Sequence, residues 1–475
     1  MTSNLGVLIM KQKKTKNNYA MLPVIFSLAW PTMLEQLMQT AVQYIDTAMV
    51  GALGTHATAA VGSTTTINWL LSSSLSALGI GFLSFIARAY GAGNKEHAAK
   101  VVTQAVLATL VSGTVFTILA LSLSGMIPKW MQVDPAIQSL ASTYFFILYI
   151  PMLPRAATII FGTALRAAGD TKTPMRVGII VNVINIILNF LLIFPTHHLQ
   201  IAGLEIVIPS AGLGVVGAAI ASAIAFATGG LYMTRALWKH PVLSPKGQKL
   251  SVDMQILRPC LKVALPNMMQ RFGTSLGYVA FASMVNSLGE ISTAAHTIAN
   301  TVESAFYIPG YGMQTAAATL AGNALGANDN KKMKEFSHMI IWVEVILMII
   351  SGSLLFIFAP SMMGIFTKDP EVIKLGSTVL RMVAVSEPFY GVSIIIEGMM
   401  LGVGETVTPF KFNILGMWGI RIVGTFICTQ LLSMTLVSAW GCMISHNMLL
   451  FLLFLIHYKR GHWNPLNRIE AELST

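Results

Sequence analysis

The sequence predicts an all-α membrane protein with twelve transmembrane helices, arranged as two pseudo-symmetric six-helix lobes. Three observations support this prediction. The chain is 54% hydrophobic and 10% charged, whereas a soluble domain carries about 25% charged residues. Its apolar segments approach the roughly 20 residues that a helix needs to cross a bilayer core. One half of the chain also repeats the other.

The repeat holds at one fixed offset. Pro31 recurs 235 positions later as Pro266, and Asp134 recurs as Asp369. The segment 169–174, Gly-Asp-Thr-Lys-Thr-Pro, returns at 404–409 as Gly-Glu-Thr-Val-Thr-Pro. Six spans per half is an even number, so both halves enter the membrane from the same side and form parallel repeats. This layout is typical of a transporter whose cargo lies between the halves.

The apolar stretches divide the chain in order. We expect spans near 23–50, 57–87, 99–126, 137–165, 174–195, 211–238, 257–287, 292–323, 336–360, 372–402, 409–433 and 436–457. They predict a cytoplasmic tail at 1–22, an N-lobe at 23–238, a cytoplasmic linker at 239–256, a C-lobe at 257–457 and a cytoplasmic tail at 458–475. Pro151 and Pro154 should break the fourth span, and Pro309 the eighth. The longest outer connection, 195–210, is too short for a soluble domain.

The formal net charge of +11 does not indicate a nucleic-acid partner, because the basic residues are unevenly distributed. Twenty-three lysines and arginines fall in connections on one side of the predicted membrane and three on the other. The positive-inside rule then predicts cytoplasmic termini and a multi-pass protein of the cell (inner) membrane. The expected partners are the lipid bilayer and a small-molecule substrate, and we expect a monomer.

Several function classes find no support in the sequence. Three cysteines fit neither a disulfide framework nor a metal site. No Gly-x-x-x-x-Gly-Lys-Ser/Thr phosphate cradle occurs, which argues against an ABC-type pump. No HExxH or GxSxG motif occurs either, so we do not expect an enzyme.

Polar residues at bilayer depth are the candidate functional residues, since an unpaired charge there is costly. Glu35, Gln39 and Asp46 fall within about 60° of one another on the first predicted helix. We interpret them as part of a cation- or proton-coupling site facing the interior. The alternatives are that Glu35 or Asp46 is solvated at a membrane surface, or neutralises an arginine such as Arg155.

The fifth and sixth predicted helices add neutral polar groups. Asn182, Asn185 and Asn189 share one face, and Ser222 follows on the next helix. Amide oxygens can ligate sodium, so Asp46, Asn185 and Asn189 form a possible sodium site. The alternative for the asparagines is helix–helix hydrogen bonding, and for Ser222 it is close packing.

The second half does not copy this site, because Phe281 stands at the position equivalent to Asp46. It has its own ionisable residues within predicted spans: Arg271, His296, Glu303, Glu344, Glu387, Glu397 and Arg421. We expect Arg271 to pair with Glu303 or Glu397. The alternative to a functional role is a structural ion-pair network.

Four segments, 31–51, 165–174, 213–221 and 294–296, resemble the multidrug and toxic compound extrusion (MATE) transporters of the bacterial NorM/DinF-like kind. The resemblance implies an exporter driven by protons or sodium. It also implies that the family's first-helix acid falls on Asp46, its polar pair on Asn185 and Asn189, and its hydroxyl on Ser222.

Members of the NorM type carry two acidic residues in the second lobe. The equivalent positions in this chain are Thr274 and a position near Tyr390, so the same acids are not present there. The residues that we assign to a substrate cavity are Arg271, Thr274, Glu303, Tyr390 and Glu397.

The resulting hypothesis is a secondary antiporter that works by alternating access. It would export amphipathic, cationic drugs, toxins or metabolites, with a transported proton or sodium ion and no bound cofactor; Arg271 leaves room for an anionic or zwitterionic cargo. The alternative on the same fold is a flippase or exporter of a lipid-linked or peptide-like metabolite. A channel or scaffold would need no buried acid.

Overall fold

The computed structural model describes residues 21–131, 133–201 and 204–467, and most of them are helical. The first repeat comprises α2 (Leu22–Gly51), α3 (Thr55–Gly91), α4 (Lys95–Leu123), α5 (Ile127–Trp130), α6 (Pro135–Tyr149), α7 (Met152–Ala167), α8 (Lys172–Ile193), β1 (Pro195–Ile201), β2 (Leu204–Ala211) and α9 (Gly214–Lys239). The expected tails 1–20 and 468–475 lie outside the described residues.

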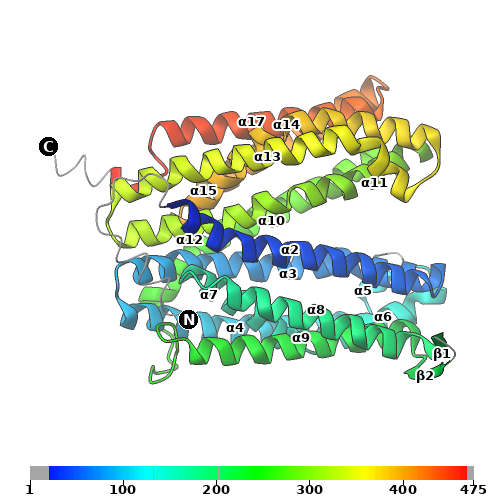
Figure 1. Cartoon of the computed structure of the whole chain (residues 1–475), viewed down its shortest axis with the longest axis horizontal. Helices are drawn as coiled ribbons and strands as arrows, with labels where there is room; N and C mark the ends of the chain where they lie inside the picture. The colour runs from blue at the N-terminus through cyan, green and yellow to red at the C-terminus, as the bar shows by residue number, and fades with distance from the viewer. Residues whose placement is uncertain (1–20, 132, 202–203, 468–475) are drawn as a thin grey trace.

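The second repeat continues with α10 (Met254–Asn286), α11 (Glu290–Phe306), α12 (Ile308–Gly326), α13 (Asn330–Phe366), α14 (Pro370–Val403), α15 (Val407–Ile414), η2 (Leu415–Ile422), α16 (Val423–Phe426), η3 (Ile427–Leu431) and α17 (Leu436–Lys459). Each predicted span is therefore a helix or a series of helices, and the all-α two-lobe prediction is confirmed (Figure 1).

Among the described residues, eight helices are long and apolar enough to cross a membrane, or nine if the bent pair α6–α7 is one span. Helices α2, α10 and the α11–α12 pair are not among them. These three spans carry Asp46, Arg271 and Glu303 respectively. Their lower apolarity therefore coincides with the ionisable residues that the sequence singles out.

The predicted breaks occur at the prolines. Helix α6 ends at Tyr149 and α7 begins at Met152, with a bend of 52° between them. Helix α11 ends at Phe306, and α12 begins at Ile308 with Pro309 in its first turn. Proline lacks the backbone N–H that would continue the helical hydrogen bonding.

The repeat extends to backbone conformation. Gly54 and Gly289 have φ values of 106° and 101°, and Gly169 and Gly404 have 84° and 86°. A side chain is strained in this region of φ, so glycine is retained at both copies. Two lobes with the same turns at the same positions are the expected product of a duplicated unit.

Two features were not expected. The connection 195–211 forms an antiparallel hairpin, β1 with β2. The eleventh span contains two π-helical segments, η2 and η3. A hydrophobic pattern reports which side of a segment is apolar, and it does not distinguish a π-turn from an α-turn.

The two lobes contact each other at one end of the molecule. We call this the basic end; it is formed by the connections 91–95, 167–172, 239–254 and 326–330. There the nearest atoms to a Cβ placed on Gly91 belong to the backbone of Asn323, and one on Gly326 would overlap the backbone of Arg88. Arg88 Nη2 donates to the Val403 oxygen at 3.3 Å.

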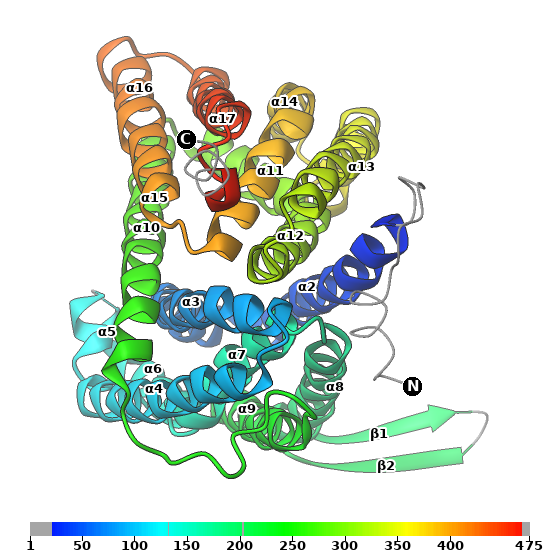
Figure 2. The ribbon, with the colours of Figure 1, turned by 90° about the vertical axis from the view of Figure 1, so that its left-hand side faces the viewer.

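Seen from the basic end, α12 lies over α2 and α3 (Figure 2). Toward the opposite end, where the hairpin lies, the ribbons of the two lobes diverge (Figure 1). Helix α2 belongs to both halves, because Ile25 and Leu28 pack in a C-lobe core whereas Val50 packs in the N-lobe core.

Candidate functional site

The structure brings together four of the predicted coupling residues inside the N-lobe: Asp46 on α2, Asn185 and Asn189 on α8, and Ser222 on α9. Asn189 Nδ2 donates to Asp46 Oδ1 at 2.6 Å. With the Asn185 amide oriented so that its nitrogen faces Asp46, that nitrogen lies 2.8 Å from Asp46 Oδ1. Its oxygen then accepts a hydrogen bond from Ser222 Oγ at 3.1 Å.

No basic side chain neutralises Asp46 within the described part of the chain, where no ion pair to it occurs. The neighbouring arginine is occupied elsewhere: Arg155 donates to Asn68 Oδ1 at 2.6 Å and to Ser72 Oγ at 2.7 Å. Its guanidinium carbon also lies 4.5 Å from the centre of the Phe226 ring. Asp46 is therefore a half-buried carboxyl group with neutral donors only. In that environment the uptake of a cation is favourable.

Asn189 supplies a further polar atom. Its side chain is 1% exposed, and its Oδ1 has no hydrogen-bond partner among the described residues. A buried carbonyl oxygen without a partner is unusual in proteins. Beside a carboxyl group, such an oxygen can accept a hydrogen bond from a proton carrier or ligate a small cation.

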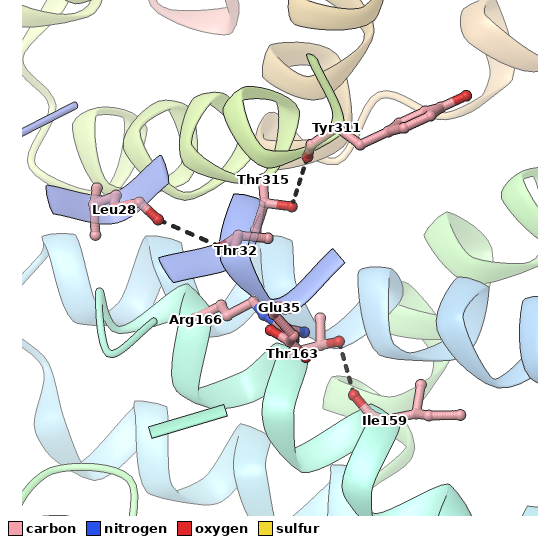
Figure 3. Close-up of polar contacts among 8 residues, drawn as sticks. All are labelled: Leu28, Thr32, Glu35, Ile159, Thr163, Arg166, Tyr311 and Thr315. Carbon is pink, nitrogen blue, oxygen red and sulfur yellow. Dashed lines mark hydrogen bonds and ion pairs between the residues drawn. The ribbon is translucent and has the colours of Figure 1, made fainter. Parts of the chain in front are cut away.

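Glu35 and Gln39 do not join this cluster. Glu35 forms an ion pair with Arg166, whose Nη2 lies 2.6 Å from Oε1 and 2.7 Å from Oε2. The pair connects α2 to α7 beside α12 (Figure 3). The alternative that Glu35 neutralises an arginine is therefore confirmed, although the partner is Arg166 and not Arg155. Gln39 is exposed. The continuous polar stripe on α2 divides into a structural ion pair and a separate acid, Asp46.

Replacing Glu35 with glutamine should destabilise the protein, because Arg166 would keep its charge in a largely buried site. Breaking one partner of a buried pair costs about 3 kcal/mol or more. The matched control is Glu96→Gln, which removes the exposed pair with Lys100 and should leave stability unchanged. Thermal unfolding of both variants in one detergent measures the difference. Equal midpoints would contradict a stabilising role for Glu35.

The predicted ion pairing of Arg271 is also wrong. In the region that the structure describes, Arg271 Nε donates to Asn267 Oδ1 at 3.1 Å, and no ion pair to a glutamate is present. Glu397 instead accepts from Gln270 Nε2 at 2.6 Å and from Asn413 at 3.4 Å. Arg271 and Glu397 therefore each bind neutral amides of the C-lobe.

A cavity of about 440 Å³ lies in the C-lobe between α10, α11, α12, η2, α14 and α17. Glu303 and Tyr390 line it, as the sequence analysis expected, and Glu303 Oε1 accepts from Tyr307 Oη at 2.5 Å. Arg271, Thr274 and Glu397 are not part of its lining. Thr274 hydrogen-bonds the backbone of its own helix.

The residue that the site assignment missed is Arg421, which lines the same cavity. An arginine within a membrane span is a candidate functional residue by itself. The sequence showed an arginine within a predicted span. It did not show that the guanidinium would lie against aromatic rings, with no ion pair to a carboxylate among the described residues. Glu344 and Glu387 are fully buried in α13 and α14, outside this lining.

Two repeated six-helix lobes that enclose a polar site between membrane-spanning helices define a multi-pass membrane transporter. The profile of the MatE family matches residues 31–191 and 266–427, one match in each repeat. The chain belongs to this family of multidrug efflux transporters.

Known relatives align with this protein over nearly the whole chain. It is similar to a probable multidrug resistance protein NorM of Thermotoga maritima, 25% identical over 92% of each chain. It is similar to the probable multidrug resistance protein YoeA of Bacillus subtilis, 26% identical over 91% of this chain and 92% of the relative. A solved structure of an outward-facing MATE transporter superposes with a TM-score of 0.85 at 22% identity, covering 96% of this chain and 100% of the other. That likeness concerns the fold.

Proposed function

We propose that this protein is a secondary antiporter that exports amphipathic organic cations in exchange for inward-moving protons taken up at Asp46. The observation that carries the proposal is the environment of Asp46: amide donors from Asn185 and Asn189, and no basic partner in the described chain. A carboxyl group with this environment is poised to alternate between neutral and charged forms.

The arrangement of the lobes suggests how uptake and export are coupled. The contacts between lobes at the basic end keep that end closed, and the basic connections favour a cytoplasmic location for it. Asp46 lies toward the opposite end of α2. Proton binding from outside and cargo binding from the cytoplasm would favour opposite-facing states, which links the two movements.

The proton is preferred over sodium because Asn189 turns its amide nitrogen toward the carboxylate of Asp46, with Nδ2 2.6 Å from Oδ1. Sodium would require that amide to present an oxygen ligand there.

Transport in proteoliposomes tests the proposal. A fluorescent aromatic cation such as ethidium should be moved against its gradient when a pH gradient is imposed, and not when a sodium gradient of equal size replaces it. Ethidium transport driven only by the sodium gradient would mean that sodium, and not the proton, is the coupling ion at this site. Downhill leakage that responds to neither gradient would contradict antiport.

A further inference from the structure

The C-lobe cavity contains a buried cation, Arg421, that forms no ion pair among the described residues. Arg421 is 3% exposed, and its Nε has no hydrogen-bond partner among the described residues. No ion pair or hydrogen bond to its guanidinium occurs in that part of the chain either. Burial of an unpaired guanidinium is expensive, so this state is far more favourable when an anion is bound.

Aromatic rings hold the guanidinium in place. Its central carbon lies 4.2 Å from the centre of the Phe281 ring and 4.8 Å from that of Tyr278. These contacts stabilise a cation through the ring faces and leave the N–H groups at the guanidinium edge free. A planar guanidinium with a free edge matches a carboxylate, which can accept two parallel hydrogen bonds.

The rest of the cavity suits an aromatic body attached to that carboxylate. Its volume is about 440 Å³, and Tyr307, Tyr311 and Tyr390 extend the aromatic lining. Asn300 and Asn447 add neutral polar groups. The carboxyl group of Glu303 faces the same space, but its Oε1 is already bound by Tyr307, and it forms no ion pair with Arg421 in the described structure.

The internal repeat adds an independent observation. Phe281, which packs on Arg421, stands 235 positions after Asp46, and Arg421 stands 235 positions after Ile186, the neighbour of Asn185. Asp46 in the N-lobe and Arg421 in the C-lobe therefore each stand where the other repeat has an apolar residue. Arg421 also lies in η2, and π-helical segments occur frequently at functional sites.

We propose that the C-lobe cavity is a binding site for aromatic carboxylates, whose acid group is held by Arg421 and whose ring lies among the tyrosines. This site is separate from the cation site at Asp46. Its interpretation as a cargo site rests on the proposed export function, whereas binding itself can be measured without any gradient.

The experiment uses the full chain in lipid nanodiscs, with calorimetric titration of three ligands of the same shape: 2-naphthoate, 2-naphthamide and 2-naphthylmethylammonium. Empty nanodiscs correct for partition into lipid. We expect naphthoate to bind at least about tenfold more tightly than the amide, as for hydrogen bonds to a charged group. Equal affinities for the three ligands, or a preference for the ammonium, would overturn the proposal even before any substitution is made.

Two variants locate the site. Arg421→Gln should weaken naphthoate roughly 10- to 100-fold and leave naphthamide unchanged, and Arg421→Lys should give an intermediate loss. The matched control is Arg381→Gln, which removes an exposed arginine over Phe356 on another part of the C-lobe. Unchanged naphthoate binding in a monodisperse Arg421→Gln protein would overturn the assignment.

Chloride and Glu303 complete the test. Competition by millimolar chloride as effective as that by naphthoate would show an inorganic anion site and overturn the aromatic assignment. Glu303→Gln should tighten naphthoate binding, because it removes an acidic group from the cavity that receives the carboxylate. Weaker naphthoate binding by this variant would contradict the proposed placement of the carboxylate. Absence of naphthoate binding by the parent protein, with intact proton-driven cation export, would refute this site alone.

Discussion

Asp46→Asn is expected to abolish cation export driven by a pH gradient, reducing it to the rate of empty liposomes. Asparagine has nearly the same shape and can still bond to Asn189, but it cannot exchange a proton between its two sides. The cargo should therefore still bind, and only its coupling to the gradient should be lost. Uphill transport by the parent and the variant in one proteoliposome preparation measures this.

The control for this substitution is Asp134→Asn. Asp134 caps α6 by accepting from the Ala136 amide at 2.8 Å, and asparagine is an equally good cap. Its transport should match that of the parent. Equilibrium binding of the labelled cation to Asp46→Asn separates lost coupling from lost folding. Undiminished gradient-driven export by Asp46→Asn would remove Asp46 from the mechanism.

The second large effect is expected at the contact between the lobes. A methyl group on Gly326 would overlap the backbone of Arg88, and backbone cannot move aside as a side chain can. Gly326→Ala should therefore disfavour the state closed at the basic end by about 1–3 kcal/mol or more. Such a free energy changes the ratio of the two states roughly 5- to 150-fold.

Site-directed labelling detects this change. Thr319 is fully buried at the lobe contact, where its hydroxyl donates to the Arg166 oxygen at 3.1 Å. A cysteine at 319, in a chain without the three native cysteines, should react faster with a bulky maleimide applied from the basic end when Gly326→Ala is present. Transport should fall in parallel.

The matched control is Gly62→Ala. Gly62 is also in a helix, but a Cβ there has no heavy atom within 4 Å, so labelling and transport should not change. Equal labelling rates for the two alanine variants would mean that the close approach of α3 and α12 does not determine the state of the transporter.

Much of the fold could be predicted from the sequence, because each span depends on its own apolar length and each break on its own proline. Both are local patterns, which require no knowledge of which helix packs against which. Helical spacing likewise places Asn185 and Asn189 on one face of α8, but their grouping with Asp46 and Ser222 came from the resemblance to the MATE transporters.

The pairing of charged side chains depends on which helices pack together, and the sequence alone does not show this. Glu35 and Arg166 are separated by 131 positions, and only the approach of α2 to α7 joins them. Arg271 was expected to bind a glutamate, yet Asn267, one turn away on its own helix, is its partner. Arg421 was visible as an unusual intramembrane charge, but its aromatic surroundings come from a different helix, α10.

The hairpin β1–β2 has a consequence for the history of the gene. Helix α17 begins at Leu436, only 222 positions after α9 begins at Gly214. The offset of 235 positions between the two repeats therefore ends at the connection that contains the hairpin. The present-day counterpart of Ser222 is therefore near Ile444, not at His457. Length changes since the duplication have accumulated at this junction, and ancestral reconstruction should treat the last helix of each copy as an independently aligned block.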